Sequence, residues 1–500
     1  MKSIKFFATT FHGFPKLMLI GLTAVVVLFL SGCKKFLDVP PKDQVPQSTL
    51  FKDEQGFKDA LIGVYLGMDK PTNGHNYGLY TTNLSMGMLT TMAYQYDNAT
   101  IANAGTGGAF YNNVVYYFYS DGEVKQEIDG IWGGMYNNIA NLNNILIQIE
   151  GKKDLFHGDN FNRVKGEAIA LRALFHFDLV RLFGQPPLTG STVKAIPYIT
   201  QFSVKSTPFA TVQSALDSCI ADLNNAKEML AAADTSRVVK GVEDPFTSYT
   251  QNHLNYWAVQ ALLARVYLYK GDYANAEKYS KAVIGSNKFP LITSNVASST
   301  NIIRDRTFSQ EHLFSVYSMN IRDYNTALFD KSAGVPLRLL PAGKNTVYTT
   351  GSGNASDYRY TSWFDNNQTA TNVPSKFFQD KNLPYELQGI VPVIRVSEMY
   401  YIAAECANKN GAISTGTDYL NNVRQARGLT ALNAGGFTNP DSLSIEIMRE
   451  YQKEFIQEGQ TFFYYKRLNK DLKQVTATTA AIPTDVYVFP IPDKEKEYNR

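Results

Sequence analysis

The sequence predicts an all-α, mainly helical protein in which pairs of helices stack into a scaffold and two long loop-rich insertions interrupt that scaffold. Apolar residues recur every three or four positions along most of the chain, as amphipathic helices require. Two pairs of these segments meet at a glycine. Residues 69–121 and 286–394 lack the period and are rich in glycine and aromatic residues. Together these observations favour one helical body with two insertions.

Residues 1–32 have the three parts of a secretory signal: a lysine-containing front, the apolar run 17–30 and small residues before a cleavage point. The run is shorter than the roughly 20 apolar residues of a spanning helix. Its end, Ser31-Gly32-Cys33, resembles the lipobox of bacterial lipoproteins, in which the thiol takes a diacylglycerol, the signal is removed before the cysteine and the new amine is acylated. The alternative is an ordinary signal peptide with an incidental cysteine. We expect a lipid anchor on Cys33 and no other cofactor or metal.

The charge of the mature chain excludes some partners. Removing residues 1–32 takes away three lysines and no acid, so the Lys and Arg total falls from 48 to 45, equal to the 45 Asp and Glu. No basic patch remains that would argue for nucleic acid. Cys219 and Cys406 fall on apolar faces of predicted helices, so we expect small buried core residues and neither a disulfide nor a nucleophile.

The body follows a tether. Residues 33–48 contain three prolines and few apolar residues, which is typical of an extended linker between lipid and folded domain. We expect residues 49–500 to form a single domain that opens with a short helix over residues 57–68. Long amphipathic helices are then predicted over residues 123–150, 161–183 and 211–233, the last with Thr211 as its N-cap.

The next predicted pair, residues 252–270 and 272–284, carries the most informative motif. Ala264, Tyr267, Gly271 and Ala276 stand where a tetratricopeptide repeat needs a small residue, an aromatic ring, a turn glycine and a small crossing residue. The same layout recurs in residues 395–409 and 417–427. Because such pairs cannot bury their faces alone, neighbours must stack.

A last helix is predicted over residues 443–458, before a packed C-terminal extension with closely spaced prolines. The two insertions, residues 69–121 and 286–394, hold many tyrosines. Loop-rich, aromatic excursions on a rigid support commonly form a binding surface.

Several motifs, in this order, resemble the SusD/RagB family of outer-membrane nutrient-uptake lipoproteins of Bacteroidetes. They are Cys33-Lys-Lys-Phe36-Leu37-Asp38, the helix 132–149, Gly166-Glu167-Ala168 to Ala173, Gly271-Asp272-Tyr273, Ile394-Arg395 to Glu405, Asn421 to Arg424, and Pro490-Ile491-Pro492. Two departures indicate a divergent branch. Gln460-Thr461-Phe462-Phe463 replaces the commoner Arg-Trp pattern, and the chain lacks the usual Asn-Pro-Gly-Tyr ending. The ligand therefore cannot be taken over from well-known members.

The resemblance implies a surface-exposed, lipid-anchored outer-membrane protein that captures an oligomeric nutrient and hands it to a SusC-like TonB-dependent β-barrel transporter. The ligand of such proteins is most often a glycan and sometimes a peptide. A flat aromatic face complements the apolar face of a sugar ring, while neighbouring polar side chains bond its hydroxyls.

Candidate ligand contacts rest on position in the insertions alone, since the family's contacts vary between members. They are Tyr94, Tyr96, Asp97 and Asn98 in the first insertion, and Arg322, Tyr324 and Trp363 in the second. The alternative for each aromatic residue is that it packs its own loop. Trp132 and Trp257 fall on helical apolar faces and are expected in the core.

Two other classes of protein remain to be weighed. A secreted glycoside hydrolase needs two carboxyls facing each other across a cleft. The carboxylates here, Glu398 and Glu405 on one predicted helix and Glu450, Glu454 and Glu458 on another, are interpreted as structural ion pairs with Arg395 and Arg449. No catalytic motif of the common hydrolases is present, and we expect no enzyme. A pure peptide-binding interaction scaffold is the second alternative.

Overall fold

The computed structural model describes residues 46–71, 77–97, 108–233, 235–330, 337–339, 344, 347–348, 357–364, 372–473, 483 and 485–498. Cys33, Asn98, the predicted signal and most of the predicted tether lie outside these residues. The chain divides into two units, Met1–Lys52 and Asp53–Arg500. In the first unit, the described part holds α2 (Gln47–Leu50). Everything below concerns the second unit.

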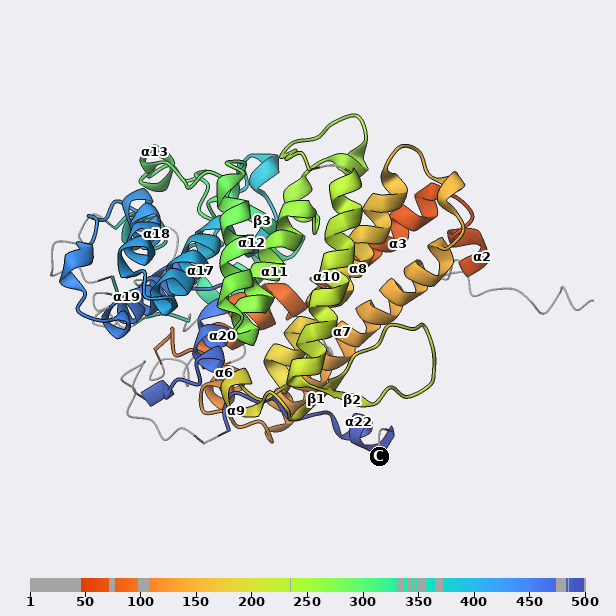
Figure 1. The fold of residues 1–500 in the computed structure, drawn as a ribbon, viewed down its shortest axis with the longest axis horizontal. Coiled ribbons are helices and arrows are strands. Elements are labelled where there is room, and N and C mark those ends of the chain that lie inside the picture. The colour runs from red at the N-terminus through yellow and green to blue at the C-terminus, as the bar shows by residue number, and fades with distance from the viewer. Residues whose placement is uncertain are drawn as a thin grey trace, which may run out of the picture. The chain divides into compact units, whose positions relative to one another are not determined.

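Long helices form a continuous row in which each packs against its neighbour in the chain order (Figure 1). The prediction of a mainly helical protein is confirmed. The row consists of α3 (Glu54–Gly67), α7 (Gly122–Ile149), α8 (Asn160–Phe183), α10 (Val212–Ala233), α11 (Tyr256–Lys270), α12 (Tyr273–Gly285), α17 (Val396–Lys409), α18 (Ile413–Ala426) and α19 (Pro440–Glu454).

Local side-chain chemistry explains where these helices begin. Thr211 is the N-cap predicted for α10, because its Oγ1 accepts a hydrogen bond from the Ser214 amide at 3.1 Å. Asp272 caps α12 in the same way through the Asn275 amide, also at 3.1 Å. Gly271 between α11 and α12 has a φ of +86°, a conformation that favours glycine. The predicted helical pair therefore turns where its glycine allows it.

Five helix boundaries differ from the predicted ones by three residues or more. α3 and α19 begin at Glu54 and Pro440, each three residues before the predicted start. α11 starts at Tyr256 instead of residue 252, because a 3₁₀ turn at Thr250–Asn252 precedes it. α18 begins at Ile413, one turn before the predicted start. α19 ends at Glu454 instead of residue 458, because the chain leaves helical geometry: Gln457 and Gly459 have positive φ angles of 64° and 70°.

The first insertion is more helical than its sequence indicates, which corrects the prediction of irregular structure over residues 69–121. It contains the π-helical turn η2 (Leu79–Met86), α4 (Met88–Met92) and α6 (Gly108–Val115). Every residue of η2 is buried, so no amphipathic period marks it in the sequence. Polar side chains inside it find partners, as when Asn83 donates to Glu127 Oε1 at 2.5 Å.

The second insertion contains strands that were not predicted. β3 (His312–Tyr317) and β4 (Ile390–Arg395) pair antiparallel, with Phe314 opposite Ile394, and so join the two ends of the insertion. β4 is buried along its whole length and therefore lacks the alternation that reveals a half-exposed strand. A second two-stranded sheet pairs β1 (Lys194–Pro197) with β2 (Phe209–Thr211).

Shorter elements complete the described chain. The short helices are α9 (Pro187–Gly190), α13 (Ser294–Ala297), α14 (Ile321–Phe329), α16 (Tyr358–Ser362), α20 (Gln460–Arg467) and α22 (Asp493–Tyr498). The further 3₁₀ turns are η3 (Lys153–Leu155), η4 (Pro245–Thr247), η6 (Ser309–Glu311), η8 (Tyr385–Leu387) and η9 (Ala434–Gly436). Across the residues that the structure describes, no helix is long and apolar enough to cross a bilayer.

Cys219, Cys406 and one of the two tryptophans assigned to the core lie where the sequence predicts. Cys219 and Cys406 are free, buried thiols, and burial raises the pKa of both. Trp132 is 5% exposed. Trp257 is only partly buried at the start of α11, where its Nε1 donates to the Thr235 carbonyl at 2.8 Å, so its assignment to the core is corrected.

Candidate ligand-binding site

The acidic side chains that a hydrolase would need are committed to ion pairs. Glu454, which is fully buried, accepts from Arg395 Nη1 at 2.6 Å and from Arg427 Nη2 at 2.6 Å. Burial alone would raise the pKa of Glu454, but the guanidinium groups of Arg427 and Arg395 hold it well below its usual value. A carboxylate held ionised in this way has no proton to donate to a leaving group.

The other carboxylates are bound similarly. Glu450 pairs with Arg359 at 2.8 Å, and Glu398 and Glu405 pair with Arg265 and Arg467. The interpretation of these groups as structural ion pairs is confirmed, including the role of Arg395. The role given to Arg449 was wrong, because Arg449 forms a surface ion pair with Glu446. The buried Glu450 and Glu454 of the same helix pair with Arg359 of another element instead.

Four of the predicted ligand contacts are buried, Asp97 at 8% exposed and three aromatic residues. Tyr96 is 3% exposed and donates to the Met86 carbonyl at 2.6 Å. The Trp363 ring is fully buried, with its Nε1 donating to the Arg306 carbonyl at 2.7 Å. Tyr324 is 5% exposed. None of these rings offers a face to solvent in this conformation, because each packs inside the folded body. The expectation of stacking faces is corrected for them.

The two insertions contact each other close to several of the candidate residues. The Asp97 amide donates to the Arg338 carbonyl at 2.7 Å, and the Tyr96 ring packs on Phe329 at the end of α14 with centroids 6.0 Å apart. α14 also carries Arg322, which is exposed and donates to the Asp380 carbonyl at 3.2 Å. Residues from 94–97 and from 322–329 therefore share one region of the molecule.

Tyr94 remains partly exposed and has an aromatic neighbour that the sequence did not single out. Its hydroxyl donates to the Val115 carbonyl at 2.9 Å. Burial, together with the nearby Tyr116 phenol, raises the pKa of Tyr94 to about 12. Tyr116 in turn stacks on Phe118, with ring centroids 5.9 Å apart and an angle of 30° between the planes.

This Tyr116–Phe118 pair is the open aromatic surface of the first insertion. Phe118 is 53% exposed, an unusual position for a phenylalanine. Between the two rings the backbone turns at Tyr117, which has a φ of 57° and a buried side chain. The run Tyr116-Tyr117-Phe118-Tyr119 was the available sequence signal, but nothing in it says which ring faces out.

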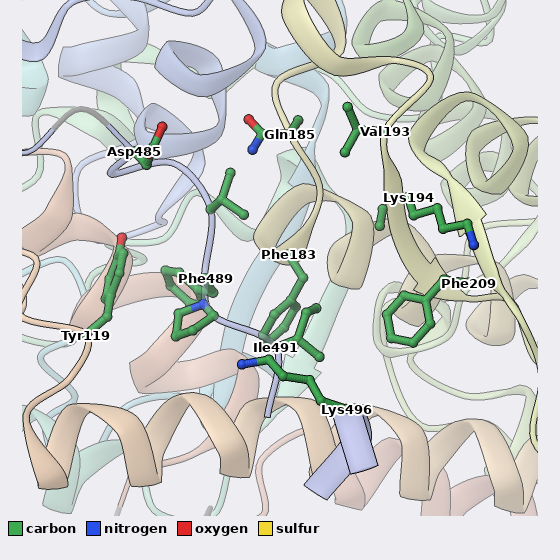
Figure 2. A pocket seen from close by; sticks show the side chains of 13 residues that line it. Tyr119, Phe183, Gln185, Val193, Lys194, Phe209, Asp485, Phe489, Ile491 and Lys496 are labelled. Carbon is green, nitrogen blue, oxygen red and sulfur yellow. The ribbon is translucent and has the colours of Figure 1, made fainter. Parts of the chain in front are cut away.

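A cavity of about 730 Å³ lies at the end of the same segment (Figure 2). Its wall combines segments far apart in the chain: the end of the first insertion, the end of α8, the β1–β2 sheet and the C-terminal extension. The lining residues are Tyr119, Phe183, Gln185, Val193, Lys194, Ala195, Phe209, Asp485, Val488, Phe489, Pro490, Ile491 and Lys496.

The C-terminal wall of the cavity is firmly held. The Phe489 amide donates to the Leu182 carbonyl at 3.0 Å, and the buried Lys466 amine donates to the carbonyls of Leu182 and Tyr487. The Phe489 ring meets Tyr119 edge-on at 5.5 Å. This wall is therefore formed before any ligand arrives, which limits the ordering cost of binding.

The described residues include no group of three or more His, Cys, Asp or Glu side chains that could hold a metal ion. What the geometry offers is ring faces, a preformed cavity and polar groups around both, mounted on stacked helical pairs. These are the features of a binding protein built on a helical-repeat scaffold.

Two family models divide the chain between them. The model described as "Starch-binding associating with outer membrane" matches residues 35–268, and the model described as "SusD family" matches residues 266–499. The chain belongs to the SusD/RagB family. Members of this family are binding proteins without catalytic activity, and the family is associated with nutrient uptake at the outer membrane.

Individual relatives agree over nearly the whole length. SusD-like protein P38 of Formosa agariphila is 23% identical, covering 98% of this chain and 97% of its own. A SusD superfamily structure from Bacteroides fragilis superposes with a TM-score of 0.68 at 21% identity, covering 90% of this chain and 99% of its own. A SusD-like carbohydrate-binding protein from Bacteroides vulgatus gives 0.66 at 17% identity, with coverages of 89% and 96%. At such identities, the structures show the shared fold.

Proposed function

We propose that this protein is a surface-exposed, lipid-anchored binding protein that captures an oligosaccharide and delivers it to a SusC-like TonB-dependent transporter in the outer membrane. The family description names starch binding, and two similar structures carry the names carbohydrate-binding protein and putative sugar-binding protein. These names support a glycan over a peptide as the ligand.

The observation that carries this proposal is the Tyr116–Phe118 pair. Its rings are stacked on each other, and Phe118 leaves more than half of its surface open to solvent. Burying such a ring against the apolar face of a sugar removes both surfaces from water. Because the aromatic pair is already in place, little conformational freedom is lost when a sugar docks.

We propose Tyr94, Asp97 and Asn98 from the first insertion and Arg322 from the second as further contacts, whose polar groups would bond the hydroxyls of the sugar. Arg322 is exposed, and its guanidinium donates a hydrogen bond to the Asp380 carbonyl. The buried rings of Tyr96, Tyr324 and Trp363 would then act from beneath, by fixing the backbone that carries these groups.

Binding to an array of plant, microbial and host glycans, with a peptide panel beside it, tests the proposal. For the class of glycan that the protein binds, we expect the double change Tyr116→Ala, Phe118→Ala to weaken binding at least tenfold. The matched control is Phe202→Ala, because Phe202 is a phenylalanine of similar exposure, 48%, in another loop. Unchanged glycan binding by a folded double variant rules out this surface, and binding to peptides alone replaces the glycan by a peptide ligand.

The anchor and the transporter need their own tests. Cys33→Ser should release the protein from membranes, and retention in the membrane fraction after a salt wash contradicts a lipid anchor. Purification of the tagged protein from its native membrane should bring a TonB-dependent β-barrel with it. Failure to recover such a protein after mild crosslinking speaks against the partner.

A further inference from the structure

The cavity of Figure 2 combines two kinds of surface that the proposed glycan site does not use. Its lining is largely apolar and aromatic: Phe183 and Phe489 are almost fully buried, at 3% and 1% exposed, and Phe209 beside them is the partly exposed ring that forms the accessible floor. Behind the floor, Trp132 meets Phe183 at 4.7 Å and lies nearly parallel to Phe209. A volume of about 730 Å³ falls within the range of natural small-molecule sites. The floor is therefore rigid and of a size to seat a ring-shaped ligand.

The charges around this floor are unequal. Two lysines line the cavity, Lys194 from β1 and Lys496 from α22, together with one acid, Asp485, and the amide of Gln185 (Figure 2). Lys194 is exposed, and within the described part of the chain no acid forms an ion pair with it. The cavity is thus a net positive site in a mature chain whose overall charge is close to zero.

Lys496 is free to turn towards a ligand. Its partner Asp493 lies 3.3 Å away, and both side chains are more than half exposed, so the pair is weak. Asp493 has a second partner, Lys125 of α7, also at 3.3 Å. When the Lys496 side chain turns from Asp493 towards a ligand, Asp493 therefore keeps Lys125 as its countercharge.

We propose that this cavity binds one residue of an acidic oligosaccharide, a sugar ring that carries a carboxylate or a sulfate. The ring would lie against the partly exposed face of Phe209, next to the buried rings of Phe183 and Phe489. Its anionic substituent would face Lys194 and Lys496, and its hydroxyls would donate to Asp485 and to the Gln185 carbonyl oxygen. A neutral sugar would use the floor but leave the two ammonium groups without a partner, and a free anion would not use the floor.

This inference rests on the proposed glycan-binding function and narrows its ligand class, but it uses a different set of residues. The cavity residues can therefore be changed without touching the Tyr116–Phe118 pair. The two proposals can be refuted independently. A neutral glycan can bind at the Tyr116–Phe118 pair even if the cavity binds nothing, and an acidic sugar can bind in the cavity even if the pair binds nothing.

The test uses the full-length protein in detergent micelles and two matched pairs of probes, read by isothermal titration calorimetry. Trigalacturonic acid is compared with its methyl ester, which has the same rings without the charge. A κ-carrageenan tetrasaccharide is compared with its desulfated form, which separates sulfate from carboxylate. The variant is Lys194→Gln, Lys496→Gln, and the matched control is Lys494→Gln, an exposed lysine on the same helix that does not line the cavity.

We expect at least one acidic probe to bind tenfold or more tightly than its neutral partner, with the preference lost in the double variant and at high salt. Lys494→Gln should bind like the original protein. Equal binding of charged and neutral probes, unchanged binding in the double variant, or no binding of either acidic probe up to millimolar concentration each overturns the inference. If Tyr116→Ala, Phe118→Ala still abolishes binding of a neutral glycan in those cases, the proposed function stands and only the acidic site fails.

Discussion

Replacing Glu454 by glutamine tests whether the buried ion network holds the second insertion to the C-terminal helices. Glu454 on α19 bonds Arg359 of the insertion at 2.9 Å as well as Arg395 and Arg427, and all four side chains are shielded from water. Glutamine keeps the shape and one acceptor but removes the charge. Three guanidinium groups would then share fewer buried countercharges.

The expected loss follows from that burial. Removing one partner of a buried ion pair costs about 3–5 kcal/mol, because the remaining charge stays out of water. A body of about 450 residues has an unfolding entropy of roughly 0.9 kcal/mol/K, at about 2.1 cal/mol/K per residue. Glu454→Gln should therefore lower the Tm by about 3–5 °C.

Thermal unfolding followed by far-UV circular dichroism measures this shift. The control is Glu446→Gln on the same helix, because Glu446 pairs with Arg449 at the surface, where such pairs contribute about 0–1 kcal/mol. A Tm change below 1 °C for Glu454→Gln, or equal losses for both variants, would refute the reasoning that burial makes this network stabilising.

Three further predictions concern the same body. Burial alone would raise the pKa of Glu450, but its arginine and lysine neighbours lower that pKa to about 2. The stability that the ionised group contributes is therefore complete above about pH 4.5 and is lost as the pH falls towards 2. When the Tm is measured against pH, the Glu450→Gln variant should show less of this acid-induced loss. Gly459→Ala should destabilise the fold by about 2–5 kcal/mol in chemical denaturation, since its φ is +70° and a Cβ would lie 2.1 Å from the Leu84 carbonyl oxygen, and wild-type stability would contradict this packing. Trp363→Phe removes the hydrogen bond to the Arg306 carbonyl, so unfolding should become easier by about 1–3 kcal/mol while glycan affinity stays within twofold; a large loss of affinity with normal stability would restore Trp363 as a direct contact.

Local patterns in the sequence determined the helical elements and their chemistry. A helix such as α10 follows from side chains three and four residues apart, and its cap follows from a single threonine. The same local geometry identified carboxylates on one face of α19 as ion-pair partners. It also placed Cys219 and Cys406 in the core.

Tertiary structure decided which partners meet. Glu450 forms its ion pair with Arg359 from the second insertion and not with Arg449, its neighbour in the sequence. Only a long-range contact takes both charges out of water together. The pairing of β3 with β4 across the insertion likewise depends on residues far apart in sequence.

The same reason explains the candidate sites. A tyrosine or phenylalanine has no pattern of its own that tells a packed ring from an open one, so Tyr96 is buried while Phe118 is exposed in the same insertion. The cavity draws Tyr119, Phe183 and Phe489 from three separate segments, the last more than 300 residues from the other two. The sequence alone determined the long amphipathic helices outside the insertions, the class of protein and the kinds of residue available for binding. Only the folded chain decided which rings reach solvent, since that depends on what every other segment covers.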